Sequence, residues 1–373
     1  MIKVINVISD ANIGGAGKCV LTFLKHYDRQ KFDLTVIVPK NSLLIPEIKN
    51  LNGKYIEVDG MNNKSLDFKV IKELRKIFCD IKPDIVHAHA AMSARIAAKF
   101  SGAKIVYTRH SVFEPSKTIS KGLGKIINGF VNNFFSDKII AVAEAAKDNL
   151  VKTGVDDKKI VVIKNGVDYL ERYNDEKITN IKKSYGLKDE FIMTIAARLT
   201  LVKGHDYILE AVKKLKDDNL DFKLLIAGTG EYEENIRNKI NILDINDKVI
   251  MLGFVSDVEK IVNITNLNLN ASFGTEATSL SLLEGLSIGI PAVVSDFGGN
   301  GGVIYNGTNG FLVPTKNSGA LYEKIKLIMQ DKNLYNTLKK GSLEVFENEF
   351  TADKVVEKIQ GVYISLKSKG EEK

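Results

Sequence analysis

Two glutamates eight residues apart, Glu276 and Glu284, stand out in the stretch ASFGTEATSLSLLEGLSIGIPAVVSDFGG. Thr278 and Ser279 are good N-caps, so we expect a helix to begin there, with Leu280 in its first turn and Glu284 about one and a half turns inside. Free amides at a helix start attract phosphate, and carboxylates accept hydrogen bonds from hydroxyl groups. The stretch therefore fits a ligand that carries both phosphate and hydroxyl groups.

Chance is the alternative, because a charged chain supplies many such glutamate pairs. Glu284 differs from a surface acid in that it falls among apolar residues, where an unpaired carboxylate is costly. These neighbours are Leu280, Leu282, Leu283, Leu286 and Ile288.

A second group of polar residues follows the apolar run FIMTIAA, where Arg198 and Lys203 occur in ARLTLVKG. A planar guanidinium and a compact ammonium at the end of a strand suit a diphosphate. Solvated surface charges are the alternative for this pair. Gly228 and Gly230 close the next strand in AGTG, where small residues leave room for a ligand or simply make a turn.

A glycine-rich loop, NIGGAGK, comes after the first apolar run and before a helix. Gly14, Gly15 and Gly17 let the backbone approach an anion, and Lys18 adds a positive charge. The loop is not a nucleotide P-loop, because Asn12 stands where that pattern needs glycine. A tight turn without a ligand remains the alternative.

Three of the five histidines, His87, His89 and His110, follow two neighbouring apolar runs. His87 and His89 share one face of an expected strand. His110 is the best candidate for a hydrogen bond to a ligand hydroxyl, and histidines satisfied by backbone groups are the alternative. A metal site is disfavoured, because no carboxylate or cysteine with ligand spacing accompanies them. The chain also lacks an Asp-x-Asp pair, so we expect no metal and no cofactor, with charge neutralised by Arg198, Lys203 and helix amides.

Thirteen short apolar runs alternate with helical patterns, which predicts mostly parallel sheets covered on both faces. The rhythm breaks after Asn165 and restarts at 191, so we predict two Rossmann-like, doubly wound α/β domains facing across a cleft: 1–165 with a C-terminal helix 352–373, and 166–351. The runs cover 3–9, 33–39, 55–60, 84–89, 104–110, 138–144, 159–165, 191–198, 222–228, 248–253, 267–272, 291–294 and 309–313.

The composition fits a soluble globular chain: 373 residues, 44% hydrophobic and 27% charged, with two cysteines and a net charge of +7. No apolar run approaches the ~18 residues of a membrane span, and VINVIS is too short for a signal peptide, so a cytoplasmic location is expected. The charge is uneven, since residues 1–164 carry 27 Lys and Arg against 16 Asp and Glu, and the remainder 26 against 30.

Segment 95–135 concentrates positive charge, with seven basic residues and one acid up to Lys125, and an amphipathic apolar set after it. Such a surface suits peripheral contact with anionic lipid at the inner face of the plasma membrane. A solvated helix face above an ordinary core stripe is the alternative. Nucleic acid is disfavoured, because no basic platform interleaved with aromatic residues is present.

Across essentially its whole length the sequence resembles glycosyltransferase family 4, the retaining nucleotide-sugar enzymes of the GT-B fold. The matching motifs are the GGAG loop, PDIVHAH, the TRH strand end, NGVD, ARLTLVKG, AGTGE, the Glu276 and Glu284 pair, and PAVVSDFGG. Two positions depart from the family pattern: Ala277 replaces a glycine, and Gly302 replaces an acid.

The resemblance implies a role for each site residue. Arg198 and Lys203 would bind the donor diphosphate, Glu284 the ribose and Glu276 the transferred sugar. His110 would lie near that sugar. The donor-binding set would be Gly15, Arg198, Lys203, Gly228, Gly230, Glu276, Thr278, Ser279, Leu280 and Glu284, and the acceptor-side set Gly14, Gly15, Gly17, Lys18, His87 and His89.

The resemblance also implies a metal-independent retaining transferase. It would move a hexose from a nucleotide-sugar, UDP favoured over GDP, to a glycan or lipid-linked acceptor in cell-envelope polysaccharide synthesis. A nucleotide-sugar epimerase or hydrolase, and a non-catalytic partner subunit, are the alternatives. A nicotinamide dehydrogenase is disfavoured by the imperfect glycine pattern.

Overall fold

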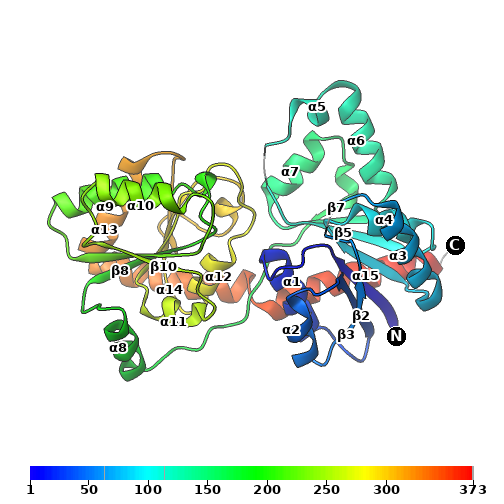
Figure 1. Ribbon diagram of the computed structural model, residues 1–373, viewed down its shortest axis with the longest axis horizontal. Helices are drawn as coiled ribbons and strands as arrows, with labels where there is room; N and C mark the ends of the chain where they lie inside the picture. The colour runs from blue at the N-terminus through cyan, green and yellow to red at the C-terminus, as the bar shows by residue number, and fades with distance from the viewer. Residues whose placement is uncertain (63, 113, 372–373) are drawn as a thin grey trace. The chain divides into compact units, whose positions relative to one another are not determined.

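The computed structural model describes residues 1–62, 64–112 and 114–371, with side chains to residue 368. The chain divides into two compact units (Figure 1). Unit 1 comprises Met1–Val167 and the C-terminal helix, and unit 2 comprises Asp168–Thr351. The predicted boundary after residue 165 lies two residues before this division. Within the described part of the chain, no helix combines the length and apolar character needed to span a bilayer.

Unit 1 is built on a parallel sheet with the strand order β3-β2-β1-β4-β5-β6-β7. The strands are β1 Ile2–Ile8, β2 Phe32–Pro39, β3 Lys54–Val58, β4 Ile85–His89, β5 Lys104–Arg109, β6 Lys138–Ala141 and β7 Ile160–Val162. The order reverses between β1 and β4, and parallel sheets of this kind bind ligands beyond the strand ends at such a point.

Helices cover both faces of this sheet, and successive residues of β1 point to opposite faces. Val4 and Ile8 pack with α1, α2 and α15, whereas Ile5 and Val7 pack with α3 and α4. The helices are α1 Gly15–His26, α2 Leu44–Asn50, α3 Phe68–Ile81, α4 Met92–Lys99, α5 Lys117–Ser120, α6 Gly122–Phe134, α7 Glu144–Lys152 and α15 Ala352–Glu371, with a 3-10 turn at Asp157–Lys159.

Unit 2 repeats the design with the parallel strand order β10-β9-β8-β11-β12-β13, which reverses between β8 and β11. The strands are β8 Phe191–Ala196, β9 Phe222–Ala227, β10 Val249–Gly253, β11 Leu267–Asn270, β12 Ala292–Ser295 and β13 Gly310–Val313. The helices are α8 Asp175–Ser184, α9 His205–Asp217, α10 Glu233–Ile242, α11 Val258–Ile264, α12 Leu280–Ser287, α13 Ser318–Gln330 and α14 Lys332–Glu349, with 3-10 turns at Leu201–Lys203 and Asn300–Gly302.

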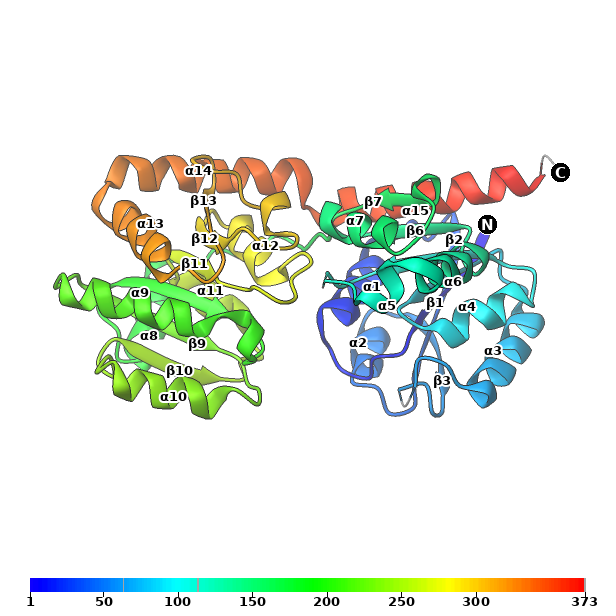
Figure 2. The same ribbon diagram turned by 90° about the horizontal axis from the view of Figure 1, so that it is seen from above.

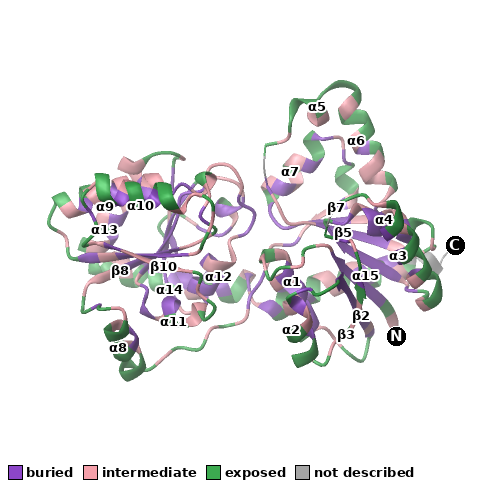
Figure 3. Ribbon diagram, in the orientation of Figure 1, coloured by how far each residue is buried: buried purple, intermediate pink, exposed green. Residues whose placement is uncertain are grey.

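The buried strands carry the two cores, as Figure 3 shows by colour. In unit 2, Met193 and Ile195 pack with α9, α10, α13 and α14, while Ile192 packs with α8 and α11. Each of the thirteen apolar runs overlaps one strand, and the prediction of two Rossmann-like parallel-sheet domains is confirmed.

The C-terminal helix α15 returns to unit 1 and packs against α1 (Figure 2). Its buried residues Val355, Val356 and Tyr363 join the core on the α1 face of the sheet. Residues 372 and 373 of the predicted helix 352–373 lie outside the described residues. One continuous helix therefore fastens the end of the chain to the first unit.

Candidate active site

Three of the predicted charged site residues of unit 2 lie in loops at the carboxyl ends of β8 and β11, where the strand order reverses. The loop after β8 carries Arg198 and ends in the short 3-10 turn that contains Lys203. The loop after β11 carries Glu276 and leads into α12. Adjacent parallel strands thus bring two loops far apart in sequence to one edge of the sheet.

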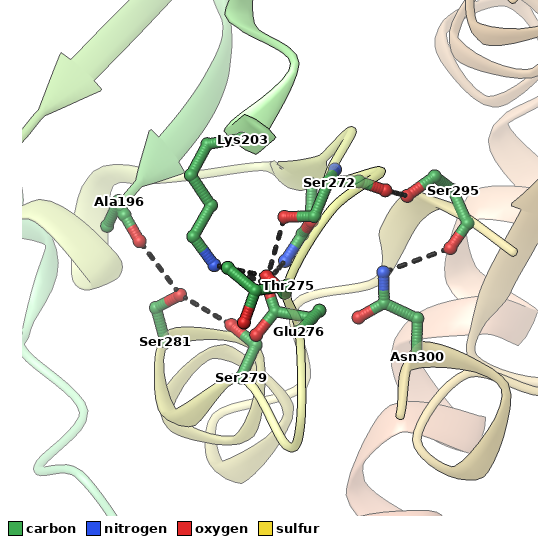
Figure 4. A network of polar contacts seen from close by, with 10 residues as sticks. Ala196, Lys203, Ser272, Thr275, Glu276, Ser279, Ser281, Ser295 and Asn300 are labelled. Atoms are coloured by element: carbon green, nitrogen blue, oxygen red, sulfur yellow. Dashed lines mark hydrogen bonds and ion pairs between the residues drawn. The ribbon is translucent and has the colours of Figure 1, made fainter. Parts of the chain in front are cut away.

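Glu276 is the centre of a buried hydrogen-bond network (Figure 4). Its Oε2 accepts from Nζ of Lys203, Nδ2 of Asn270 and Oγ of Ser272, each at 2.9 Å. Lys203 also donates to the carbonyl of Thr275 at 3.2 Å. A buried carboxylate is tolerable because it is paired and fully hydrogen-bonded on that oxygen.

A third loop, which follows β12, supports the backbone of Glu276. Gly298 has φ of +60°, and a Cβ there would lie 2.1 Å from the carbonyl oxygen of Glu276. The amide of Gly299 donates to the same carbonyl. Asn300 holds this loop by donating to the carbonyl of Ser295 at 2.9 Å, so the SDFGG motif positions the glutamate.

The start of α12 is tied to the end of β8. Ser281 Oγ donates to the carbonyl of Ala196 at 3.1 Å and lies 3.0 Å from Oγ of Ser279. Ser279 occupies the predicted N-cap position. Its side chain does not bond the first helical amides, so the predicted capping role of that side chain was wrong. The Ser281 contact instead ties the first turn of α12 to the end of β8.

The remaining predicted residues of unit 2 differ in their surroundings. Thr278 and Glu284 are buried, and Leu280 is partly buried as the first residue of α12. Arg198 is exposed. Gly228 and Gly230 approach the backbone of the Arg198 loop, and a Cβ on either would lie 2.0 or 2.1 Å from a carbonyl oxygen of that loop. These two glycines therefore have a packing role.

In unit 1 the glycine loop leads into α1, as predicted. Gly14 is the N-cap, Gly15 is the first helical residue, and the amide of Lys18 donates to the carbonyl of Gly14. Gly17 is close-packed, because a Cβ there would lie 3.0 Å from Leu44, whereas a Cβ on Gly15 would meet nothing within 4 Å. Gly15 is thus the position of this loop with open space beside its Cα.

The three predicted histidines form one cluster at the carboxyl ends of β4 and β5. His89 Nδ1 and His110 Nε2 are 2.8 Å apart, and the rings of His87 and His89 lie 4.3 Å apart. His87 bonds the hydroxyl groups of Tyr363 and Thr108 through its two nitrogens, each at 2.6 Å.

Burial keeps these histidines neutral. It lowers the pKa of His87 to about 3 and that of His110 to about 4, and it holds the pKa of His89 well below its ordinary value. At neutral pH each ring therefore carries one proton and acts as one donor and one acceptor.

A small cavity of about 30 Å³ adjoins the histidine cluster. Cys19 lines it and donates to Oδ1 of Asn165 at 3.3 Å. Burial raises the pKa of the Cys19 thiol to about 12, so the thiol stays protonated and is not a nucleophile. Among the described residues, no group of three His, Cys, Asp or Glu is arranged to hold a metal ion.

Sequence reasoning missed several contributors: Asn270, Ser272, Ser281, Asn300 and Tyr363. Asn270 ends a strand, LNLN, in which polar residues alternate with leucines and all four positions are buried. A buried asparagine at a strand end is a usable signal, because it must find partners. Tyr363 gave no signal, since nothing in a helical repeat shows that one tyrosine reaches a distant strand.

Two family profiles together match most of the chain. Residues 13–169 match "Glycosyltransferase Family 4" and residues 177–344 match "Glycosyl transferases group 1". An Escherichia coli UDP-Gal:alpha-D-GlcNAc-diphosphoundecaprenol alpha-1,3-galactosyltransferase is 27% identical over 98% of this chain and 97% of its own length. The Staphylococcus aureus capsular polysaccharide biosynthesis glycosyltransferase CapM is 24% identical over 88% of this chain and 89% of its own length.

The fold has solved counterparts as well. Anabaena HepE, crystallised in complex with UDP, superimposes with a TM-score of 0.85 at 19% sequence identity, covering 98% of this chain and all of its own. At that identity the likeness concerns the fold, and it confirms the predicted GT-B class.

Proposed function

This chain belongs to glycosyltransferase family 4, and we propose that it moves a sugar from a UDP-sugar to a hydroxyl of a lipid-linked or glycan acceptor in cell-envelope polysaccharide synthesis. The activities named for the Escherichia coli and Staphylococcus aureus relatives support this acceptor class. The UDP bound to the Anabaena protein supports the choice of nucleotide.

The observation that carries the proposal is the pairing of Lys203 with Glu276. An ammonium has three N–H donors. Two of them are directed to Glu276 and Thr275, so the third is left for a phosphate oxygen. Oε1 of Glu276 remains to accept hydrogen bonds from hydroxyl groups of the transferred sugar.

The reaction follows from these groups. The acceptor hydroxyl oxygen forms a bond to the anomeric carbon on the face from which the diphosphate departs. The bond from that carbon to the diphosphate oxygen breaks, the oxygen keeps the electron pair, and it takes the proton of the acceptor hydroxyl. Lys203, Arg198 and the first amides of α12 stabilise the charge that grows on the diphosphate. The transfer therefore retains the anomeric configuration and uses no metal ion.

A donor panel tests the proposal. UDP-, GDP- and ADP-sugars are each added at about a hundred times the dissociation constant, which stabilises a protein by about 2.7 kcal/mol. We expect UDP-sugars to raise the melting temperature. NMR of the product with acceptor should show the donor's anomeric configuration. Conversion of donor in the absence of acceptor as the main reaction would instead identify a hydrolase or epimerase.

We further propose that unit 1 contacts an anionic membrane through segment 95–135, of which residue 113 lies outside the described residues. Helix α6 exposes its apolar face and turns its polar face inward. Its outer face, defined as Leu123, Ile126, Ile127, Phe130 and Phe134, is exposed by 45 to 70%. These five residues fall within about 100° of arc on an α-helix.

The inward face of α6 is polar and small. Asn128 and Asn133 donate to the carbonyls of Thr153 and Gly154, and Gly129 is the one buried residue of the helix. Arg95 donates to Oδ1 of Asn132. Figure 3 shows α6 coloured mainly as exposed and intermediate. An ordinary surface helix has the opposite polarity, so the exposed stripe is not the back of a core stripe.

Positive charge surrounds the outer face, which supports anionic lipid as its partner. Lys99, Lys117, Lys121 and Lys125 are exposed, and Nζ of Lys99 lies 4.6 Å from the ring centre of Phe134. Each basic residue near an anionic surface adds about 1 kcal/mol. Aromatic and aliphatic groups that enter the interface add the apolar part of the binding energy.

Vesicle sedimentation tests the membrane contact. The double variant Ile126→Ser with Phe130→Ser should lose at least tenfold in binding to vesicles that contain phosphatidylglycerol. The matched control, Ile242→Ser with Phe254→Ser, removes two exposed apolar residues of unit 2 and should bind like the wild type. Equal binding to neutral and anionic vesicles, or equal losses in both variants, would contradict the contact.

A further inference from the structure

The histidine cluster contains a hydrogen bond whose direction the surroundings determine. Nδ1 of His89 and Nε2 of His110 are 2.8 Å apart, so one of them donates and the other accepts. If His110 donates, the proton of His89 is on Nε2. If His89 donates, its Nε2 carries only a lone pair, and the proton of His110 is on Nδ1.

Nε2 of His89 decides between these two arrangements. It is buried and has no hydrogen-bond partner among the described residues. The neighbouring ring of His87 cannot serve, because both of its nitrogens bond hydroxyl groups. Among backbone groups, orphaned buried N–H donors are rarer in folded proteins than unpaired acceptors, and we apply the same preference to the imidazole nitrogens. The arrangement with a bare Nε2 on His89 is therefore favoured.

The low pKa values of these rings support the proton count. Burial is the largest cause for each of the three histidines, and it disfavours the charged form. Each ring thus holds a single proton at neutral pH, and the proton that His89 donates is the only one it has.

The ring of His89 is held in place from behind. His87 packs against it at 4.3 Å and is itself fixed by Thr108 on β5 and by Tyr363 on α15. Tyr363 is fully buried and packs edge-on against Phe23 and Phe32. The C-terminal helix therefore belongs to the structure that fixes the histidine cluster.

We propose that His89 is a positioning residue for His110: its Nδ1–H donates to Nε2 of His110, so that His110 presents a proton on Nδ1 to the bound ligand. His87 and Tyr363 hold the ring of His89 in the orientation that this requires. The consequence for sugar transfer rests on the proposed function, but the tautomer itself does not.

Long-range ¹H–¹⁵N NMR on protein labelled at histidine nitrogens tests the tautomer without any substrate. We expect the Nδ1–H form of His110 and the Nδ1–H form of His89 in the wild type. In Tyr363→Phe, which removes one hydroxyl from the cluster, the His87 signals should shift. An Nε2–H form of His110 in the wild type would overturn the proposal.

Kinetics provide the second test. His89→Leu removes the donor and should lower kcat at least tenfold while KM for the donor stays within twofold. His89→Asn keeps an amide donor near the place of Nδ1 and should recover most of that loss. Equal kcat losses in the two variants, or an unchanged kcat in His89→Leu, would contradict positioning. If His89→Leu fails to fold, the asparagine variant and the wild-type NMR still decide.

Discussion

Among single residues, Lys203 and Glu276 are central because they share hydrogen bonds with each other and with their neighbours. Three donors converge on Oε2 of Glu276, one of them the Lys203 ammonium. This arrangement holds the ammonium at the carboxyl end of the sheet, where the helix start of α12 also directs its amides. The pair is thus organised before any ligand arrives, which is what electrostatic stabilisation of a leaving group needs.

Removal of either cation is the direct consequence to test. Lys203→Ala and Arg198→Ala should each lower kcat on the order of 100-fold, because each removes a positive group to which the proposed function assigns stabilisation of the departing diphosphate. Steady-state kinetics with saturating donor and acceptor measure this. Lys213→Ala replaces a half-exposed lysine of the same unit that pairs with Asp217, and this matched control should retain wild-type kcat. Near-normal rates for both site variants would remove the account of leaving-group stabilisation.

The sequence predicted most of these residues by type, but not their contacts. The sequence predicts His87, His89, His110 and Lys203 at or just after strand ends, and Glu276 just before a helix. The structure has the expected strands and the helix α12 at these places. That Lys203 bonds Glu276 could not be foreseen, because 73 residues separate them. The contact depends on which strands are neighbours, and local patterns do not determine strand order.

At the scale of elements, short loops with glycine do the positioning. Gly298 adopts a left-handed conformation and lies against the carbonyl of Glu276, where no Cβ fits. The same loop bonds that carbonyl through Gly299. The glutamate is therefore held from two sides: by side chains on Oε2 and by backbone behind it.

A glycine-to-alanine comparison separates strain from contact. Gly298→Ala should weaken donor binding and cost at least 2 kcal/mol of stability, since left-handed strain adds to a clash with Glu276. Gly307→Ala, with φ of +76° and nothing within 4 Å, should cost about 1 kcal/mol and leave donor binding unchanged. Urea unfolding and calorimetry measure both effects. Similar donor affinities in the two variants would show that the loop does not position Glu276.

Helix α6 shows that an apolar repeat predicts a helix but not the direction in which its apolar face points. The repeat of Leu123, Ile126, Ile127, Phe130 and Phe134 predicts an amphipathic helix, and α6 is one. The direction of the apolar stripe was left open, because the same repeat serves a core or a surface. Asparagines and a buried glycine on the opposite face settle it, since their hydrogen bonds are made inward.

At the scale of the whole molecule, buried neutral histidines occur in both units. His205 begins α9, and burial lowers its pKa to about 4, as it does for His110. In the unfolded chain each of these two histidines binds a proton near pH 6.5, whereas in the folded protein it stays neutral until the pH approaches 4. The stability that these groups contribute is complete above pH 6.5 and is lost as the pH falls toward 4.

Acid should therefore destabilise the protein measurably between pH 7 and pH 5. Each such histidine contributes about 2 kcal/mol of that loss, because the slope approaches 1.4 kcal/mol per pH unit. Urea unfolding at the two pH values measures it. His205→Leu removes one titrating group and should reduce the loss by about 2 kcal/mol. A loss of the same size in this variant and the wild type would contradict the assignment.

Calorimetric titration of UDP in the presence of EDTA tests the central idea most directly, namely that side chains and helix amides alone neutralise the diphosphate. We expect UDP to bind with the same affinity, within twofold, in EDTA and in magnesium, and at least tenfold more weakly to Lys203→Ala in both. Loss of UDP binding on chelation, or an affinity in Lys203→Ala equal to that of the wild type, would contradict it.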